Sequence, residues 1–136
     1  MKPDLRNRAD IQFLVDAFYK KALEDERIGH FFTEVVQLSF EEHLPVIYDF
    51  WESLLFGTMN YKGNPMLKHI ALDQKQQLRG MHFEQWKKLF FETIDEHFEG
   101  KKATEAKQKA TNIAHLMLFK IKQNRGGLGI SILEKN

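Results

Sequence analysis

The residues of this chain best suited to chemistry are its six histidines, at positions 30, 43, 69, 82, 97 and 115. No two of them are closer than 13 residues, so no pair can chelate a metal from one turn of a helix. None has a glutamate three residues before it, which excludes the Glu-x-x-His pairs of di-iron bundles, and the His-Glu-x-x-His zinc helix is missing too. A metal site made of protein ligands alone is therefore not expected.

Other catalytic chemistries also lack their residues. The chain has no cysteine, which excludes disulfides, thiolate metal sites, iron–sulfur clusters and cysteine nucleophiles. Spacing leaves a Ser–His–Asp triad open, but no nucleophile elbow surrounds Ser39, Ser53 or Ser131. The glycines at 126, 127 and 129 follow the last predicted helix instead of opening one, so they predict no phosphate-binding loop.

Length and charge narrow the class of protein further. The 136 residues fit one domain, and 20 basic residues are interspersed with 19 acidic ones for a net charge of +1. This balance gives no argument for binding nucleic acid or an anionic membrane. The first eight residues lack the apolar core of a signal peptide, and no uncharged run approaches the ~20 residues of a membrane helix. We expect a soluble, cytoplasmic protein.

Apolar residues recur at helical spacing through most of the chain, and no β-alternating run occurs, so the expected class is all-α. Asn7 or Asp10 is expected to cap the first helix. Ser39 and Glu42 form a capping box for the second helix, whose first turn Pro45 should distort. The four long helices are expected over about residues 8–25, 39–57, 82–100 and 103–124.

Between the second and third of these helices, residues 58–80 form a looser segment that contains Gly63 and Pro65. We expect one short turn around residues 66–70 and a solvated connection over residues 73–77. A loop of this length is uncommon inside a compact domain and is typically functional.

The residues remain compatible with binding a cofactor that needs one histidine and much apolar surface, and haem is such a cofactor. Twelve phenylalanines and two tryptophans suit a slot for a flat ligand, although a dense aromatic core explains them as well. His69 follows the Pro65 turn, and His82 opens a helix that carries Phe83 and Trp86. Either histidine fits the role of axial ligand to haem iron, and spacing alone does not choose between them.

Several short sequence fragments over about residues 8–124 occur in an order and at a spacing that indicate a protein family. They are Asp10-Ile11 with Phe18-Tyr19 and Phe32, His43-Leu44-Pro45, Phe50-Trp51, Tyr61-x-Gly63-x-Pro65-x-x-x-His69, and His82-Phe83-x-x-Trp86-x-x-Leu89-Phe90. In this order and spacing the chain resembles a truncated haemoglobin of the third group. The resemblance implies a globin domain over residues 1–124, with helices packed two-on-two around haem b, and a flexible tail over residues 125–136.

The same resemblance implies roles for individual residues. His69, and not His82, is the implied proximal iron ligand. The implied distal residues that stabilise a bound ligand are Tyr19, His43 and Trp86. We expect the rest of the haem pocket to contain Phe32, Ile47, Phe50, Met66, Phe83 and Phe90. Lys68 adjoins His69 and Tyr61 precedes His69 by eight residues, so either is a candidate contact of a haem carboxylate, although a solvated side chain explains Lys68 equally well.

The expected function is reversible binding of O2, and also of NO and CO, with slow release of O2. Hydrogen bonds to a charged ligand contribute about 1.5–3 kcal/mol each, so donors from Tyr19 and Trp86 would slow release by roughly 10²–10⁴. The alternative is a haem enzyme for NO dioxygenation or peroxidase-like chemistry, served by an unidentified reductase, with His43 as gate or proton donor. A helical interaction domain without a cofactor is a third hypothesis.

Overall fold

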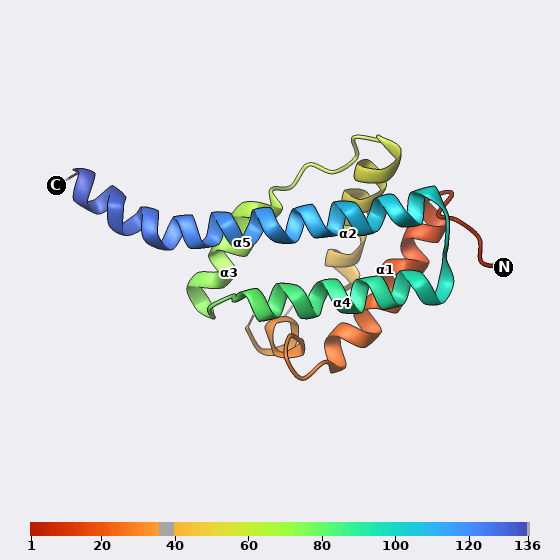
Figure 1. The fold of residues 1–136 in the computed structure, drawn as a ribbon, viewed down its shortest axis with the longest axis horizontal. Helices are drawn as coiled ribbons and strands as arrows, with labels where there is room; N and C mark the ends of the chain where they lie inside the picture. The colour runs from red at the N-terminus through yellow and green to blue at the C-terminus, as the bar shows by residue number, and fades with distance from the viewer. Residues whose placement is uncertain (36–39, 136) are drawn as a thin grey trace.

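Five α-helices and one π-helical segment build the described part of the chain (Figure 1). The computed structural model describes the backbone of residues 1–35 and 40–135 and the side chains of residues 1–33 and 41–125. Within these ranges there is no β-strand, so the predicted all-α class is confirmed. The elements are α1 (Arg8–Glu24), η1 (Phe31–Val35), α2 (Phe40–Phe56), α3 (Pro65–Lys75), α4 (Gly80–His97) and α5 (Lys101–Lys135).

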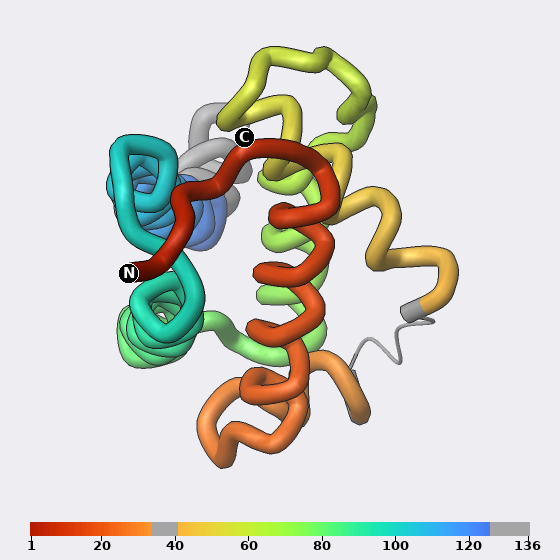
Figure 2. The backbone as a smooth tube through the Cα atoms, turned by 90° about the vertical axis from the view of Figure 1, so that its right-hand side faces the viewer, coloured from red at the N-terminus to blue at the C-terminus, as the bar shows by residue number. Residues whose placement is uncertain are grey.

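The long helices stack in two layers of two. α4 and α5 run antiparallel in one layer, and α1 and α2 cross behind them (Figure 1), while Figure 2 looks nearly along α4 and α5. α1 packs on α2 and α4, α4 packs on α5, and α3 packs on α5. This is the predicted two-on-two arrangement. Across the described residues, no helix has both the length and the apolar character required to cross a membrane.

α1 forms where its sequence predicts it. The Asn7 side chain accepts a hydrogen bond from the Asp10 backbone N–H at 3.1 Å and so caps the helix. The buried face has helical spacing and consists of Ile11, Leu14, Val15, Phe18 and Ala22. Of the features predicted for α2, Pro45 lies inside the helix, whereas the capping residue Ser39 lies outside the described residues.

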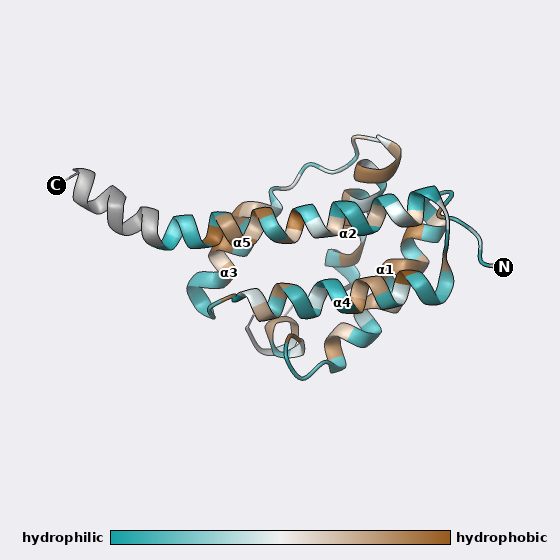
Figure 3. Ribbon diagram, in the orientation of Figure 1, coloured by the Kyte–Doolittle hydropathy of each residue, from teal (hydrophilic) through white to brown (hydrophobic). Residues whose placement is uncertain are grey.

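Small side chains on α5 allow it to pack closely on α4. α5 buries alanines at 103, 106, 110 and 114, and α4 buries larger side chains at Leu89, Phe90 and Ile94. Hydrophobic and hydrophilic bands accordingly alternate along both helices (Figure 3). Each helix therefore presents one apolar stripe to the core, as its sequence period predicts.

α3 is longer than the sequence predicts. Instead of one turn it spans Pro65–Lys75, capped by the Asn64 side chain, which accepts a hydrogen bond from the Leu67 N–H at 3.1 Å. The prediction of a solvated connection from residue 73 is wrong at Asp73, which is buried with 8% exposure. The Asp73 carboxylate binds Arg125 of α5 at 2.7 Å and accepts from the Leu78 N–H at 2.8 Å. These partners stabilise the buried Asp73 carboxylate, which the sequence alone predicts to face solvent.

α5 also extends further than predicted. Its bounds are Lys101–Lys135, so the predicted helix end near Asn124 is wrong. The glycines at 126, 127 and 129 each weaken a helix by only about 1 kcal/mol, and no proline follows to stop it. The division into a domain over residues 1–124 and a flexible tail over 125–136 remains a prediction.

Candidate functional site

A cavity of about 500 Å³ lies among all the helices of the domain. Its volume falls within the range of small-molecule and cofactor sites, and most of its walls are apolar or aromatic. Of the residues predicted for the site, Met66 does not line the cavity but packs against the core. The others all line it: Tyr19, Phe32, His43, Ile47, Phe50, Tyr61, Lys68, His69, Phe83, Trp86 and Phe90.

His69 lies on the first turns of α3, and its ring is fixed by the backbone. Its Nδ1 atom lies 2.7 Å from the carbonyl oxygen of Pro65, four residues earlier. A carbonyl can only accept, so Nδ1 carries the hydrogen and Nε2 keeps its lone pair. Burial lowers the pKa of His69, against the opposing effect of the Pro65 bond, and the charge of Lys68 lowers it further. The imidazole is therefore neutral and can ligate a metal ion through Nε2.

His82, at the start of α4, lines the same cavity but is held in the opposite way. Its Nδ1 accepts a hydrogen bond from the Arg79 backbone N–H at 2.9 Å, so the neutral ring carries its hydrogen on Nε2. Binding a metal through Nε2 would require breaking this bond. The geometry therefore favours His69 over His82 as a nitrogen ligand.

Two hydrogen-bond donors, Tyr19 on α1 and Trp86 on α4, line the cavity. The Tyr19 ring packs edge-on against Phe32 at 5.4 Å, and Trp86 stacks parallel to Phe90 at 5.5 Å. Phe90 in turn stacks on Trp51 at 4.7 Å, which holds it in place. Burial raises the pKa of the Tyr19 hydroxyl. Both side chains therefore keep their hydrogens and are held by ring packing.

His43, on α2, is the third polar group expected in the distal half of the cavity. It is half-buried, and burial lowers its pKa, with smaller electrostatic contributions from Lys68 and His69. His43 on α2 and Lys68 on α3 line the same cavity. A neutral imidazole beside a cavity can accept or donate a proton near neutral pH.

Several cavity residues are absent from the sequence-based prediction. Lys75 is a polar one. The apolar ones include Phe31, Trp51, Ile113 and Met117, the last two from α5. Their spacing of four residues marks a buried face of α5, but the sequence cannot distinguish a cavity wall from ordinary core. Among the residues that the structure describes, no group of three or more His, Cys, Asp or Glu side chains could hold a metal ion by itself.

Comparison with known proteins decides the family. A sequence model of the bacterial-like globins matches residues 5–119. The chain belongs to the bacterial-like globins. This globin is 35% identical over 98 residues, 70% of its own length and 75% of the relative's, to the group 3 truncated hemoglobin ctb of Campylobacter jejuni. The resemblance to the third group of truncated haemoglobins is therefore confirmed.

The fold comparison agrees. The crystal structure of the group III truncated hemoglobin from Campylobacter jejuni matches this globin with a TM-score of 0.78 and 28% sequence identity. The match covers 89% of this chain and 95% of that one. Membership of the globin family makes this chain a haem-binding protein, and the donor set fits that cofactor because His69 offers a neutral nitrogen inside an aromatic cavity.

Proposed function

We propose that this globin reversibly binds O2, and also NO and CO, through haem b with His69 as its axial ligand. The observation that carries the proposal is the 2.7 Å hydrogen bond between His69 Nδ1 and the Pro65 carbonyl oxygen. Such a bond orients a ligating imidazole, fixes its tautomer and raises the basicity of Nε2. When bound, haem supplies a ferrous iron that takes diatomic gases at an open coordination position.

The Tyr19 hydroxyl and the Trp86 indole N–H would then donate to a ligand that carries partial negative charge. Each such bond contributes about 1.5–3 kcal/mol, and two of them slow release by roughly 10²–10⁴. The ring contacts of Tyr19 and Trp86 support this role because they fix both donors before a ligand arrives. Slow release suits scavenging or sensing of a gas better than carrying it.

Two residues at the edge of the cavity are suited to the haem carboxylates. Lys68 is exposed and also lines the cavity, so its ammonium group can reach both solvent and ligand. Tyr61 also lines the cavity, with its hydroxyl against Gly63, where a Cβ atom would collide with the phenol ring. Gly63 thus leaves room for the Tyr61 side chain next to the cavity.

A haem enzyme with NO dioxygenase or peroxidase-like activity is the second candidate. The neutral His43 imidazole favours it, since a proton donor or acceptor beside the ligand is what such chemistry adds to simple binding. Sustained turnover of peroxide, or of NO in the presence of a reductant, would support this second candidate. Absence of both would leave gas binding as the function.

The proposal is tested by the rate of O2 dissociation from the ferrous protein, measured by stopped-flow displacement with CO. Each of Tyr19→Phe and Trp86→Phe should release O2 about tenfold to a hundredfold faster than the wild type. Tyr48→Phe removes a hydroxyl that binds Asp16 outside the cavity and should leave the rate unchanged. Equal rates in all four proteins would contradict the proposed role of the two donors.

A further inference from the structure

The edge of the cavity along α3 carries positive charge that acidic side chains do not balance. Residues 1–56 contain 11 acidic and 6 basic residues, whereas residues 57–79 contain 4 basic residues and one acidic residue, Asp73. Asp73 is buried and bound to Arg125, so its charge is already neutralised. The basic side chains of this segment are all exposed, and we call them the α3 rim: Lys62, Lys68, Lys75 and Arg79.

Two of the four rim cations line the cavity, and the other two are sequence neighbours of residues that line it. Lys68 and Lys75 line the cavity and lie two turns apart on one face of α3. Lys62 directly follows Tyr61 and Arg79 directly follows Leu78, and both of these neighbours line the cavity. None of the four rim cations forms an ion pair with any described residue. Because Lys68 is assigned to a haem carboxylate, the charge available to a partner at the cavity edge is mainly that of Lys62, Lys75 and Arg79.

An exposed apolar side chain lies within the rim. Leu67 is 62% exposed on α3, next to Lys68. Protein interfaces commonly have an apolar centre with a polar or charged border, and complementary charge raises the rate of encounter. An exposed leucine beside these cations thus fits a protein partner with an acidic surface better than it fits a small ion.

We propose that the α3 rim docks an acidic one-electron carrier protein, which reduces the ferric globin to its gas-binding ferrous form. The inference rests on the proposed function, because only a haem iron that cycles between these states needs an electron donor. One electron leaves the reduced carrier and enters the ferric iron, so the carrier is oxidised by one electron and no atom or proton is exchanged. Docking along α3 brings the carrier to the element that bears His69.

The test uses the haem-loaded protein and a photoreduced plant-type [2Fe–2S] ferredoxin, which is an acidic one-electron donor. The rim variant is Lys62→Glu with Arg79→Glu, since neither residue lines the cavity. The control variant is Lys20→Glu with Lys88→Glu, which makes the same change of charge at exposed lysines of α1 and α4. Haem uptake and the CO spectrum of each variant are recorded first, so that failure of the proposed function is recognised separately.

Reduction of the ferric protein is then followed by stopped flow under CO, at about 0.01 M and about 1 M salt, where charges are screened beyond ~30 Å and ~3 Å respectively. At low salt the rim variant should react about tenfold or more slowly than the wild type, and the control less than twofold more slowly. At high salt the three rates should converge. NMR shifts on adding oxidised ferredoxin give an equilibrium measure of the same docking. Equal low-salt rates for the rim and control variants would overturn the proposal.

Discussion

The imidazoles of His69 and His82 line one cavity but are held in opposite neutral tautomers. His69 Nδ1 donates to the Pro65 carbonyl oxygen at 2.7 Å, whereas His82 Nδ1 accepts the Arg79 backbone N–H at 2.9 Å. The backbone sets both tautomers, because a carbonyl only accepts and an amide N–H only donates. His69 can therefore ligate through Nε2 with its existing hydrogen bond intact, and His82 cannot.

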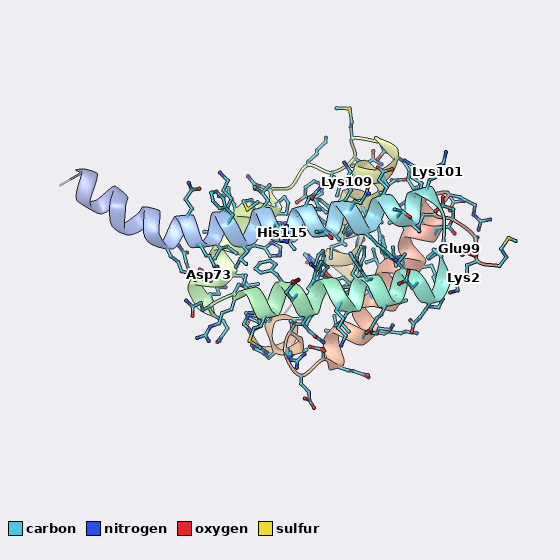
Figure 4. The ribbon with its side chains drawn as sticks, viewed as in Figure 1. Lys2, Asp73, Glu99, Lys101, Lys109 and His115 are labelled. Atoms are coloured by element: carbon cyan, nitrogen blue, oxygen red, sulfur yellow. The ribbon has the colours of Figure 1, made fainter. Side chains whose placement is uncertain are left out.

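His82 is accordingly predicted to be a structural residue. His82→Ala removes the acceptor of the Arg79 N–H at the start of α4 and should lower the free energy of unfolding by about 0.5–2 kcal/mol, as loss of a helix cap does. Urea unfolding of the apo-protein measures this change. His115→Ala, at an exposed position on α5 (Figure 4), is the control and should change stability by less than about 0.5 kcal/mol. Equal stability of the two variants would contradict the capping role.

The burial of His82 predicts how stability depends on pH. Burial, followed by the positive charges of His30 and Arg79, holds the pKa of His82 below its ordinary value of 6.5. The unfolded chain thus binds a proton more readily than the folded protein. The stabilisation by neutral His82 is complete above pH 6.5 and is lost as the pH falls through the folded pKa. Between about pH 8 and 5, the free energy of unfolding should therefore fall more steeply with falling pH for the wild-type apo-protein than for His82→Ala. Equal pH dependences of the two proteins would contradict this prediction.

Arg125 is predicted to hold the end of α3 in place. Its guanidinium donates to Asp73 at 2.7 Å and to the Leu78 carbonyl oxygen at 2.6 Å (Asp73 is labelled in Figure 4). Arg125→Ala should lower the free energy of unfolding by about 1–2 kcal/mol at pH 7, a value reduced for the partial exposure of the arginine. Lys122→Ala, an exposed neighbour on α5, should cost less than about 0.5 kcal/mol.

Acid should reduce this difference. The hydrogen bond from Arg125 is the main cause that lowers the pKa of Asp73 from its ordinary 3.8. The carboxylate therefore contributes stability above pH 3.8, and this contribution is lost as the pH falls through the folded pKa. Wild type and Arg125→Ala should therefore differ less in stability below that pH, where the bond from Arg125 to the Leu78 carbonyl oxygen remains. A difference that stays constant on acidification would mean that the charge of Asp73 does not contribute to the role of Arg125.

The fold could be predicted where one stretch of sequence contains all the determinants. α1 is an example, because Asn7 and the apolar stripe through Phe18 lie within a few turns of each other. The length of α3 could not be predicted in this way. Asp73 and the glutamines after it look solvated in sequence, and the partner that buries Asp73 is Arg125, 52 residues later. Only tertiary structure brings the two together.

The candidate site could also be predicted only in part from the sequence. The residues predicted for the site all line the cavity except Met66, but several other lining residues were not predicted. The choice between His69 and His82 depends on which backbone group meets each Nδ1 atom, and spacing carries no information about that. Lys75 could not be predicted as a cavity residue because residues 73–77 look like a solvated connection in sequence, and its place at the cavity edge depends on how α3 packs.

The central claim is that His69 is the axial ligand of a haem that binds gases. Its most direct test is the optical spectrum of the ferrous, haem-loaded protein with and without CO, for wild type, His69→Gly and His82→Ala. Wild type and His82→Ala should give a five-coordinate, histidine-ligated spectrum that shifts with CO. His69→Gly should lose that spectrum and regain it when free imidazole is added. An unchanged spectrum in His69→Gly would contradict the ligand assignment, and no haem uptake by the wild type would contradict the proposed function itself.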